Sequence, residues 1–327
     1  MGVINRVVAA IFAMAISTGH AGGAEQPDKA RRIGSLSPAG QLSARDDAVK
    51  QDLRERGWIE GRNLVIEYRW AAGKLDQLPT LAKDLVRLKV DVIVAWSTPA
   101  ALAAQSATRT IPIVMGTVAD PIGTGLIASL GRPGGNITGV SLMSPELAGK
   151  RLELLKELAP GLARVAFLAN GGDPAYRLFV KETQDAAEKI GIHIQPLVVK
   201  GPEDFDGAFS AAIKEGAGAL IVQPLFVTIG GHGRTLAELA IKHRLPTISD
   251  GNLFAELGGL IYYGPERLAL DRRVAYYVDR ILRGTQPADL PVEQPQTFAL
   301  VLNLQTAKRL GVAIPQSLLF RADKVIK

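Results

Sequence analysis

Residues 91–95 read Asp-Val-Ile-Val-Ala, and an alanine-rich stretch from Pro99 to Ala107 follows them after a short Trp-Ser-Thr connection. Four consecutive apolar residues that end at a turn are typical of a strand buried on both faces. The stretch 99–107 favours a helix, because alanine has the highest helix propensity and proline is tolerated in the first turn. Together they predict one βα unit, with its strand inside a parallel sheet.

The same strand-then-helix pattern recurs along most of the chain. Strands are expected at 32–37, 63–69, 91–95, 111–115, 136–140, 164–169, 192–199, 219–223, 246–249, 260–263 and 298–302. Helices are expected at 42–56, 75–88, 99–107, 122–130, 145–158, 175–190, 204–215, 236–243, 265–282 and 304–310. A chain of 327 residues suits two domains. We therefore expect an α/β fold: two doubly wound parallel-sheet lobes with a ligand cleft between them.

Residues 1–24 differ in composition from the rest of the chain. Arg6 is their one formally charged side chain, residues 7–16 are all apolar, and small residues dominate 19–24. This is the pattern of a cleavable secretory signal peptide, and its apolar run is too short for a hydrocarbon core of about 30 Å. We expect cleavage after Ala21 or Ala24 and a soluble periplasmic protein. The alternatives are an N-terminal membrane anchor and a buried helix.

Composition and missing motifs narrow the classes of function. The 47% apolar and 21% charged residues exclude a largely disordered chain, and the lack of cysteine excludes disulfides, iron–sulfur clusters and thiolate zinc sites. The net charge of +6 comes from scattered charges of both signs, so no nucleic-acid partner is expected. Phosphate-binding, dinucleotide-binding and hydrolase-elbow motifs are missing, and the four histidines are scattered. We expect no cofactor, no metal and no catalytic residue.

Ligands of open α/β sheets bind beyond the carboxyl ends of the strands. The residues there are nearly all small and polar, and none is histidine or lysine, so they form a hydrogen-bonding set rather than an acid–base set. The candidate ligand-binding residues are Ser37, Ser97, Thr98, Thr117, Asp120, Ser141, Asn170, Gln223 and Asp250. The alternative for each is a helix cap or turn, since Ser, Thr, Asp and Asn dominate both roles.

Several candidates have specific alternatives. Asp120 precedes a proline and either meets a cationic ligand group or caps the following segment. Asn170 opens an Asn-Gly-Gly-Asp-Pro loop, which lets backbone approach a ligand or forms a left-handed turn. Asp250, in Ser-Asp-Gly-Asn, equally suits a turn. Three aromatic residues either wall the cleft or belong to the core: Trp96, Tyr176 and Tyr263.

The chain resembles the ABC transporter substrate-binding protein family, in particular the uncharacterised periplasmic components of the tryptophan/tyrosine-binding type. The resemblance covers about residues 31–327. The segments that carry it are 53–63 (LRERGWIEGRN), 66–70 (IEYRW), 91–104 (DVIVAWSTPAALAA), 132–141 (RPGGNITGVS), 150–158 (KRLELLKEL), 258–264 (GGLIYYG), 277–295 (YVDRILRGTQPADLPVEQP) and 303–308 (NLQTAK).

The resemblance implies a type I periplasmic binding protein whose chain crosses between lobes near 141–146, 262–266 and 291–297. It implies an N-terminal lobe of 31–143 plus 264–292 and a C-terminal lobe of 144–263 plus 293–327. The same nine candidate residues match the family's cleft loops. Two residues depart from the family's pattern. Trp96 replaces a small residue, which would narrow the pocket, and Gly171 replaces a proline, which would loosen the Asn170 loop.

We therefore expect a monomeric periplasmic component of an ABC importer, which captures a small polar or aromatic amino-acid-like ligand. It would deliver this ligand to a membrane permease and its ATPase subunit. One alternative is an exported α/β enzyme acting on a small molecule in the same cleft, for which Asp120, Asp173 and Asp250 are the available acids. Another is a sensory protein that docks on a receptor.

Overall fold

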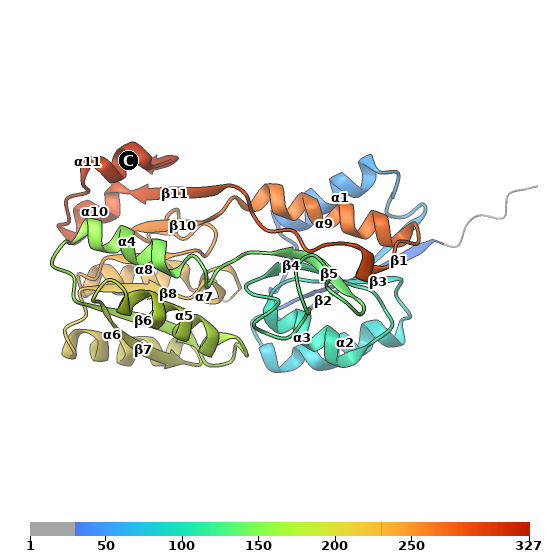
Figure 1. Ribbon diagram of the computed structural model, residues 1–327, viewed down its shortest axis with the longest axis horizontal. Helices are drawn as coiled ribbons and strands as arrows, with labels where there is room; N and C mark the ends of the chain where they lie inside the picture. Colours follow the sequence, from blue (N-terminus) through green and yellow to red (C-terminus); the bar gives the residue numbers. More distant parts are fainter. Residues whose placement is uncertain (1–29, 230) are drawn as a thin grey trace, which may run out of the picture.

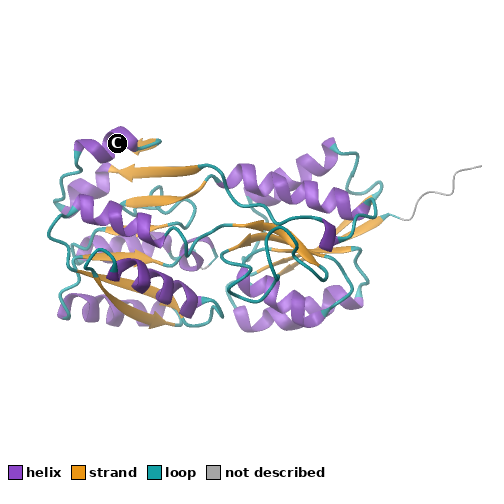
Figure 2. Cartoon of the chain, viewed as in Figure 1, coloured by secondary structure: helices purple, strands orange, loops and turns teal. Residues whose placement is uncertain are grey.

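Two β-sheets organise the chain in the computed structural model, which describes residues 30–229 and 231–327 (Figure 1). The strand order is β2-β1-β3-β4-β5 in the first sheet and β12-β11-β10-β9-β8-β6-β7 in the second. Helices cover both faces of each sheet (Figure 2). The expected α/β fold with two lobes is therefore confirmed. The signal segment expected at 1–24 lies outside the described residues.

The first sheet is parallel throughout. Its strands are β1 (Arg31–Ser37), β2 (Leu64–Trp70), β3 (Val92–Ala95), β4 (Ile113–Val118) and β5 (Ile137–Ser141). Its helices are α1 (Ala44–Glu55), the 3₁₀ helix η1 (Leu75–Gln77), α2 (Leu78–Arg87), α3 (Thr98–Ala107) and α9 (Arg267–Leu282), with the 3₁₀ helix η3 (Pro287–Asp289) beside β5.

Strand β3 shows why this lobe needs two layers of helices. Ile93 and Ala95 pack with α2 and α3, whereas Val92 and Val94 pack with α1 and α9. All four side chains are buried, as the apolar run predicts. Because all strands of this sheet are parallel, their carboxyl ends meet at one edge of the sheet.

The second sheet is parallel apart from the antiparallel pair β10–β11. Its strands are β6 (Arg164–Asn170), β7 (His193–Val199), β8 (Ala219–Val222), β9 (Thr247–Ser249), β10 (Ile261–Pro265), β11 (Phe298–Asn303) and β12 (Lys324–Ile326). Its helices are α4 (Ala148–Leu158), α5 (Tyr176–Glu188), η2 (Pro202–Asp204), α6 (Phe205–Lys214), α7 (Pro224–Thr228), α8 (Gly233–Lys242), α10 (Leu304–Leu310) and α11 (Gln316–Arg321).

Three segments connect the two lobes. The chain leaves the first lobe after β5, returns to it after β10 as helix α9, and leaves again before β11 (Figure 1). Strand β11 re-enters the second sheet from the end at which β10 leaves, so the two strands run antiparallel. The first and last connections also pair, since Ser141 donates a backbone hydrogen bond of 2.9 Å to Glu293.

The prediction of a helix at 122–130 is wrong. These residues form turns, with Gly125 at a φ of +72° and Leu126 and Ile127 both donating to the carbonyl of Pro121. Glycine and proline outweigh the apolar spacing of this segment. Among the described residues, no helix combines the length and apolar character required to cross a bilayer.

Candidate functional site

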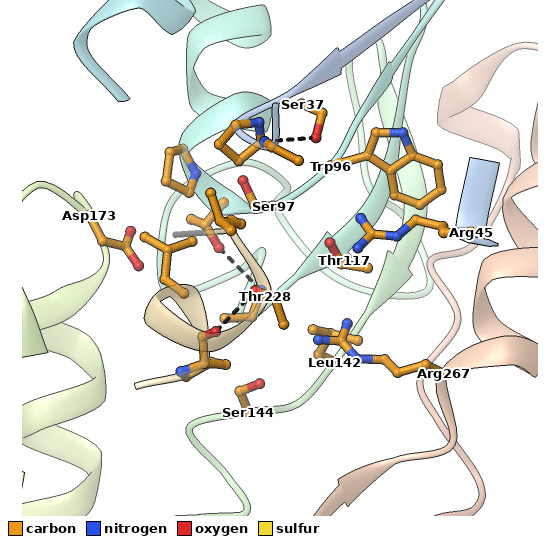
Figure 3. A pocket seen from close by; sticks show the side chains of 18 of the residues that line it. Ser37, Arg45, Trp96, Ser97, Thr117, Leu142, Ser144, Asp173, Thr228 and Arg267 are labelled. Carbon is orange, nitrogen blue, oxygen red and sulfur yellow. Dashed lines mark hydrogen bonds between the residues drawn. The ribbon is translucent and has the colours of Figure 1, made fainter. Parts of the chain in front are cut away.

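A cavity of about 50 Å³ lies between the lobes, where the carboxyl ends of β1, β3 and β4 face helix α7 (Figure 3). Such an edge is the usual ligand position in α/β sheets. The first lobe contributes Ser37, Pro38, Ala39, Arg45, Trp96, Ser97, Thr98, Pro99, Thr117, Ala119 and Arg267. The crossing segment after β5 contributes Leu142 and Ser144, and the second lobe contributes Asp173, Phe179, Pro224, Leu225, Thr228 and Ile229.

The turn between β3 and α3 presents a strained serine to this cavity. Ser97 has a φ of +96°, a left-handed backbone angle that costs a residue with a side chain about 1–3 kcal/mol. Its hydroxyl is buried and has no hydrogen-bond partner. The neighbouring Thr98 hydroxyl, by contrast, accepts a 3.2 Å bond from the backbone N–H of Ala119. Ser97 is therefore free to bond a ligand.

Trp96 fills the inner side of the cavity. Only 2% of the residue is exposed, and its indole N–H donates to the Ser35 hydroxyl at 3.1 Å. The ring lies directly over Gly116, where an added Cβ would come within 2.1 Å of a ring carbon. Trp96 thus both lines the cavity and belongs to the core of the first lobe, and its narrowing of the ligand pocket stays a prediction.

Two arginines missed by our reading of the strand ends border the same cavity (Figure 3). The Arg45 guanidinium lies 4.7 Å from the centre of the Trp96 ring, and its Nε is 4.0 Å from an oxygen of Asp271. Two nitrogens of Arg267, Nε and Nη1, are buried without a hydrogen-bond partner. Burial lowers the pKa of Arg45 and raises that of Asp271, because both charged forms lose hydration.

One sequence signal does point to these arginines. Arg45 lies in the first turn of α1, and Arg267 is the first residue of α9. The N-terminus of a helix carries partial positive charge, so a cation there is unfavourable unless something else requires it.

The acid that lines the cavity from the second lobe is Asp173, which is 3% exposed. One carboxylate oxygen accepts from the N–H of Ala175 at 3.0 Å, and the other accepts from the Gln223 amide at 2.7 Å. Gln223 in turn accepts from the backbone N–H of Asn170 at 2.6 Å. Burial raises the pKa of Asp173 to about 6, against the lowering effect of these two bonds.

Four of the nine predicted residues line the cavity: Ser37, Ser97, Thr98 and Thr117. The other five do not belong to its lining: Asp120, Ser141, Asn170, Gln223 and Asp250. Of the three aromatic candidates, Trp96 lines it, whereas Tyr176 packs on the second lobe's core and Tyr263 stacks near Phe298.

Contacts within the protein account for most of the residues outside the lining. One oxygen of Asp120 accepts the backbone N–H groups of Ile122 and Gly123, both at 2.9 Å, which is the capping role weighed above. Asp250 lies 3.5 Å from Arg151 in a fully buried ion pair. Asn170 accepts from Gly172 at 2.9 Å within its own loop. That Asp120, Asp250 and Asn170 reach a ligand in another arrangement of the lobes stays a prediction.

The arrangement suits binding better than catalysis. Of the three acids that an enzyme in this cleft would use, only Asp173 lines the cavity. No cluster of three metal-ligating side chains occurs in the described ranges 30–229 and 231–327. What the cavity offers is unpartnered hydroxyl and guanidinium groups, which bind polar parts of a small molecule.

Comparison with known proteins supports this assignment. The model of the ABC transporter substrate binding protein family matches residues 38–326, and the chain belongs to this family. Its architecture is that of the type I periplasmic binding proteins. A leucine binding protein from Thermotoga maritima shares the fold, with a TM-score of 0.58 at 16% identity over 77% of this chain and 83% of its own.

The relatives with higher identity carry more specific names. A tyrosine-binding protein of Clostridioides difficile (strain R20291) is 27% identical over 261 residues, which is 80% of this chain and 74% of the relative. The structure of an ABC domain from Streptococcus pneumonia in complex with L-Trp has a TM-score of 0.82 at 28% identity. A conserved domain protein from Vibrio cholerae has the same TM-score at 27% identity. Both structures cover 91% of this chain and are matched over their full length.

Proposed function

We propose that this protein is the periplasmic solute-binding component of an ABC importer. It captures a small polar or aromatic amino-acid-like ligand between its lobes and delivers it, unchanged, to a membrane permease coupled to an ATPase subunit. The observation that carries the proposal is the convergence of unpartnered polar groups on one cavity between the lobes: the hydroxyls of Ser97 and Ser144 and the guanidinium of Arg267.

The energetics favour a ligand at this position. Each buried polar group without a partner costs about 1–3 kcal/mol, and a ligand that bonds it recovers that cost. Ser97 belongs to the first lobe and Ser144 to a crossing segment, while Thr228 and Asp173 belong to the second lobe. A ligand that contacts all of them binds the closed arrangement better than the open one and so stabilises closure.

Ligand entry requires the lobes to separate. A cavity of about 50 Å³ has room for one or two water molecules, and an amino acid is larger. We propose that the moving bodies are 31–143 plus 264–292 and 144–263 plus 293–327, hinged at the three crossing segments. The monomeric protein would be exported by the signal segment 1–24. The names of the relatives that bind tyrosine and L-Trp support an amino-acid-like ligand.

The test uses the full chain, expressed in a bacterium with a periplasm and recovered from that compartment. Mass spectrometry of the N-terminus reports whether cleavage follows Ala21 or Ala24. Thermal melting is then recorded against amino acids, aromatic acids and small sugars. A ligand at 100 times its dissociation constant adds about 2.7 kcal/mol, which raises the melting temperature by several degrees.

Product analysis after incubation separates binding from catalysis, because a transport component returns its ligand chemically intact. A shift with one chemical class and no turnover supports the proposal. Turnover of that ligand by the pure protein would favour the exported enzyme. No shift with any class would contradict capture of this kind of ligand.

A further inference from the structure

We propose that Arg45 and Arg267 form an anion subsite, so that the cleft prefers small organic acids of net negative charge over zwitterionic amino acids of the same shape. The inference rests on the proposed function and narrows its ligand class. The chemistry is that of a carboxylate on an aromatic or polar skeleton that lacks the ammonium group.

The geometry of the two guanidinium groups supports this subsite. Figure 3 shows both side chains extending from the same side toward the middle of the cavity. Arg45 is held against the face of Trp96, and Arg267 has two buried nitrogens without a partner. The guanidinium edges Nε/Nη2 and Nη1/Nη2 each present paired N–H groups that match the two oxygens of a carboxylate, and Arg267 has one unpartnered nitrogen on each edge. The N-terminus of the 16-residue helix α9 adds partial positive charge at Arg267.

The carboxylates near the arginines leave guanidinium N–H groups available to a ligand. Asp271 approaches Arg45 no closer than 4.0 Å, which is too long for a hydrogen bond, and Asp46 acts on Arg45 through its charge. Nε and Nη1 of Arg267 have no hydrogen-bond partner. An anionic ligand group would bond these nitrogens directly.

A ligand ammonium group, in contrast, meets fewer open hydrogen-bonding groups than a carboxylate does. Asp271 Oδ1 has no hydrogen-bond partner, but it lies in a neighbouring hollow and faces Arg45 at 4.0 Å. Asp120, which we expected to meet it, lies outside the lining and caps its own turn. Asp173 is the carboxylate that does line the cavity, but both of its oxygens already accept hydrogen bonds.

The subsite also has space beside it. Arg45, Arg267 and Thr228 border a second hollow of about 280 Å³, whose wall continues through Ser43, Asn252 and Leu268. The two arginines therefore line both hollows. A ligand larger than the inner cavity can place its anion on the arginines and its remaining atoms in this hollow.

The experiment compares three compounds on one skeleton, by calorimetry with the full chain: indole-3-propionate, tryptophan and indole-3-propionamide. The phenol series provides a second set: 3-(4-hydroxyphenyl)propionate, tyrosine and the matching amide. We expect at least one acid to bind about tenfold or more tightly than its zwitterion and its amide. Arg267→Gln should weaken the acid about tenfold or more and change the amide less than twofold. Arg45→Gln should act in the same direction.

Arg309→Gln is the matched control, since Arg309 pairs with Glu238 on the exposed surface of the second lobe. Arg267→Lys keeps the charge and should retain part of the preference for the acid, which guards against a Gln variant that folds poorly. Tighter binding of tryptophan or tyrosine than of the acids would overturn the subsite and leave the proposed function standing. So would an unchanged acid affinity in folded Arg267→Gln. Absence of binding by every compound would overturn the subsite, and it would overturn the proposed function as well if the melting screen also showed no shift.

Discussion

The two lobes place polar residues at the same positions, after their strands, but use them differently. In the first lobe Ser37, Ser97 and Thr117 line the cavity, and the hydroxyl of Ser97 has no partner. In the second lobe Gln223 and Asp250 bond within the protein, Gln223 to Asp173 and the backbone of Asn170, and Asp250 to Arg151. Polarity at a strand end therefore does not identify a ligand contact. We infer that a better sign is an unpartnered polar group on the cavity lining, as at Ser97.

We therefore propose that the first lobe provides most of the affinity for the ligand and that the polar network of the second lobe provides structural support. This division also predicts an order of events. The ligand first meets the strained Ser97 turn and the two arginines, and the second lobe then closes over the ligand. The following predictions test that division.

The largest expected effect is a loss of stability from a substitution in the second lobe. Asp250→Asn leaves Arg151, which is only 2% exposed, as a buried cation without its ion pair. Removing one partner of a buried pair costs about 3–5 kcal/mol, and urea unfolding at pH 7 measures it. Asp206→Asn, which breaks an exposed pair with Lys242, is the control and should leave the unfolding midpoint unchanged. Equal stability of Asp250→Asn and the wild type would show that Asp250 has no structural role.

A pH-dependent effect comes next, from Asp173. Its folded pKa of about 6 lies above the unfolded value near 3.8, so the folded state binds the proton more tightly. The contribution of Asp173 to the free energy of unfolding is therefore greatest below pH 3.8. It falls as the pH rises through 6, by about 3 kcal/mol in total. The free energy of unfolding of Asp173→Asn should not show this decline. Unfolding of the variant and of the wild type from pH 4.5 to 7.5 measures the difference. A constant difference between the two proteins across this range would refute the raised pKa.

Gly116→Ala tests the inner wall of the first lobe. The new methyl group overlaps the Trp96 ring, so the indole must move, at an expected cost of about 1–3 kcal/mol. Tryptophan fluorescence should change together with stability. Gly131→Ala is the control, because its Cβ would meet nothing within 4 Å. An unchanged emission spectrum in Gly116→Ala would contradict the placement of Trp96 over this glycine.

The smallest effect concerns Asp120. Asp120→Ala removes a cap on its own turn, which costs about 1 kcal/mol of stability, and should change ligand affinity less than twofold. Calorimetry with any ligand found in the melting screen measures the affinity. A loss of tenfold or more would return Asp120 to the binding site and weaken the case against an ammonium partner.

The sequence predicts the fold well for a physical reason. Strands such as β3 and β8 are buried on both faces, and only a sheet covered by two helix layers provides that environment. The one helix predicted wrongly is at 122–130. Glycine and proline favour a local turn there, and this turn overrides the apolar spacing. The short elements α7, α11 and β12 lack a periodic pattern long enough to be recognised.

The site is only half visible in the sequence. The strand-end rule finds Ser37, Ser97, Thr98 and Thr117 because the edge of a parallel sheet gathers those positions. It misses Arg45 and Arg267, which belong to helices, and α9 reaches the first lobe only through a crossing from the second. It also cannot show that Asp250 meets Arg151, since that pair depends on the packing of α4 against β9.

The most direct test of the central claim compares one serine from a strand end in each lobe: Ser97, which follows β3, and Ser249, which ends β9. The hydroxyl of Ser249 donates to Val222 at 2.7 Å and accepts from Gly251 at 2.9 Å, whereas that of Ser97 has no partner. Ligand affinity and unfolding free energy are measured for both alanine variants. We predict that Ser97→Ala lowers affinity about tenfold without loss of stability, and that Ser249→Ala loses about 1–3 kcal/mol of stability without loss of affinity. The reverse pattern would contradict the account.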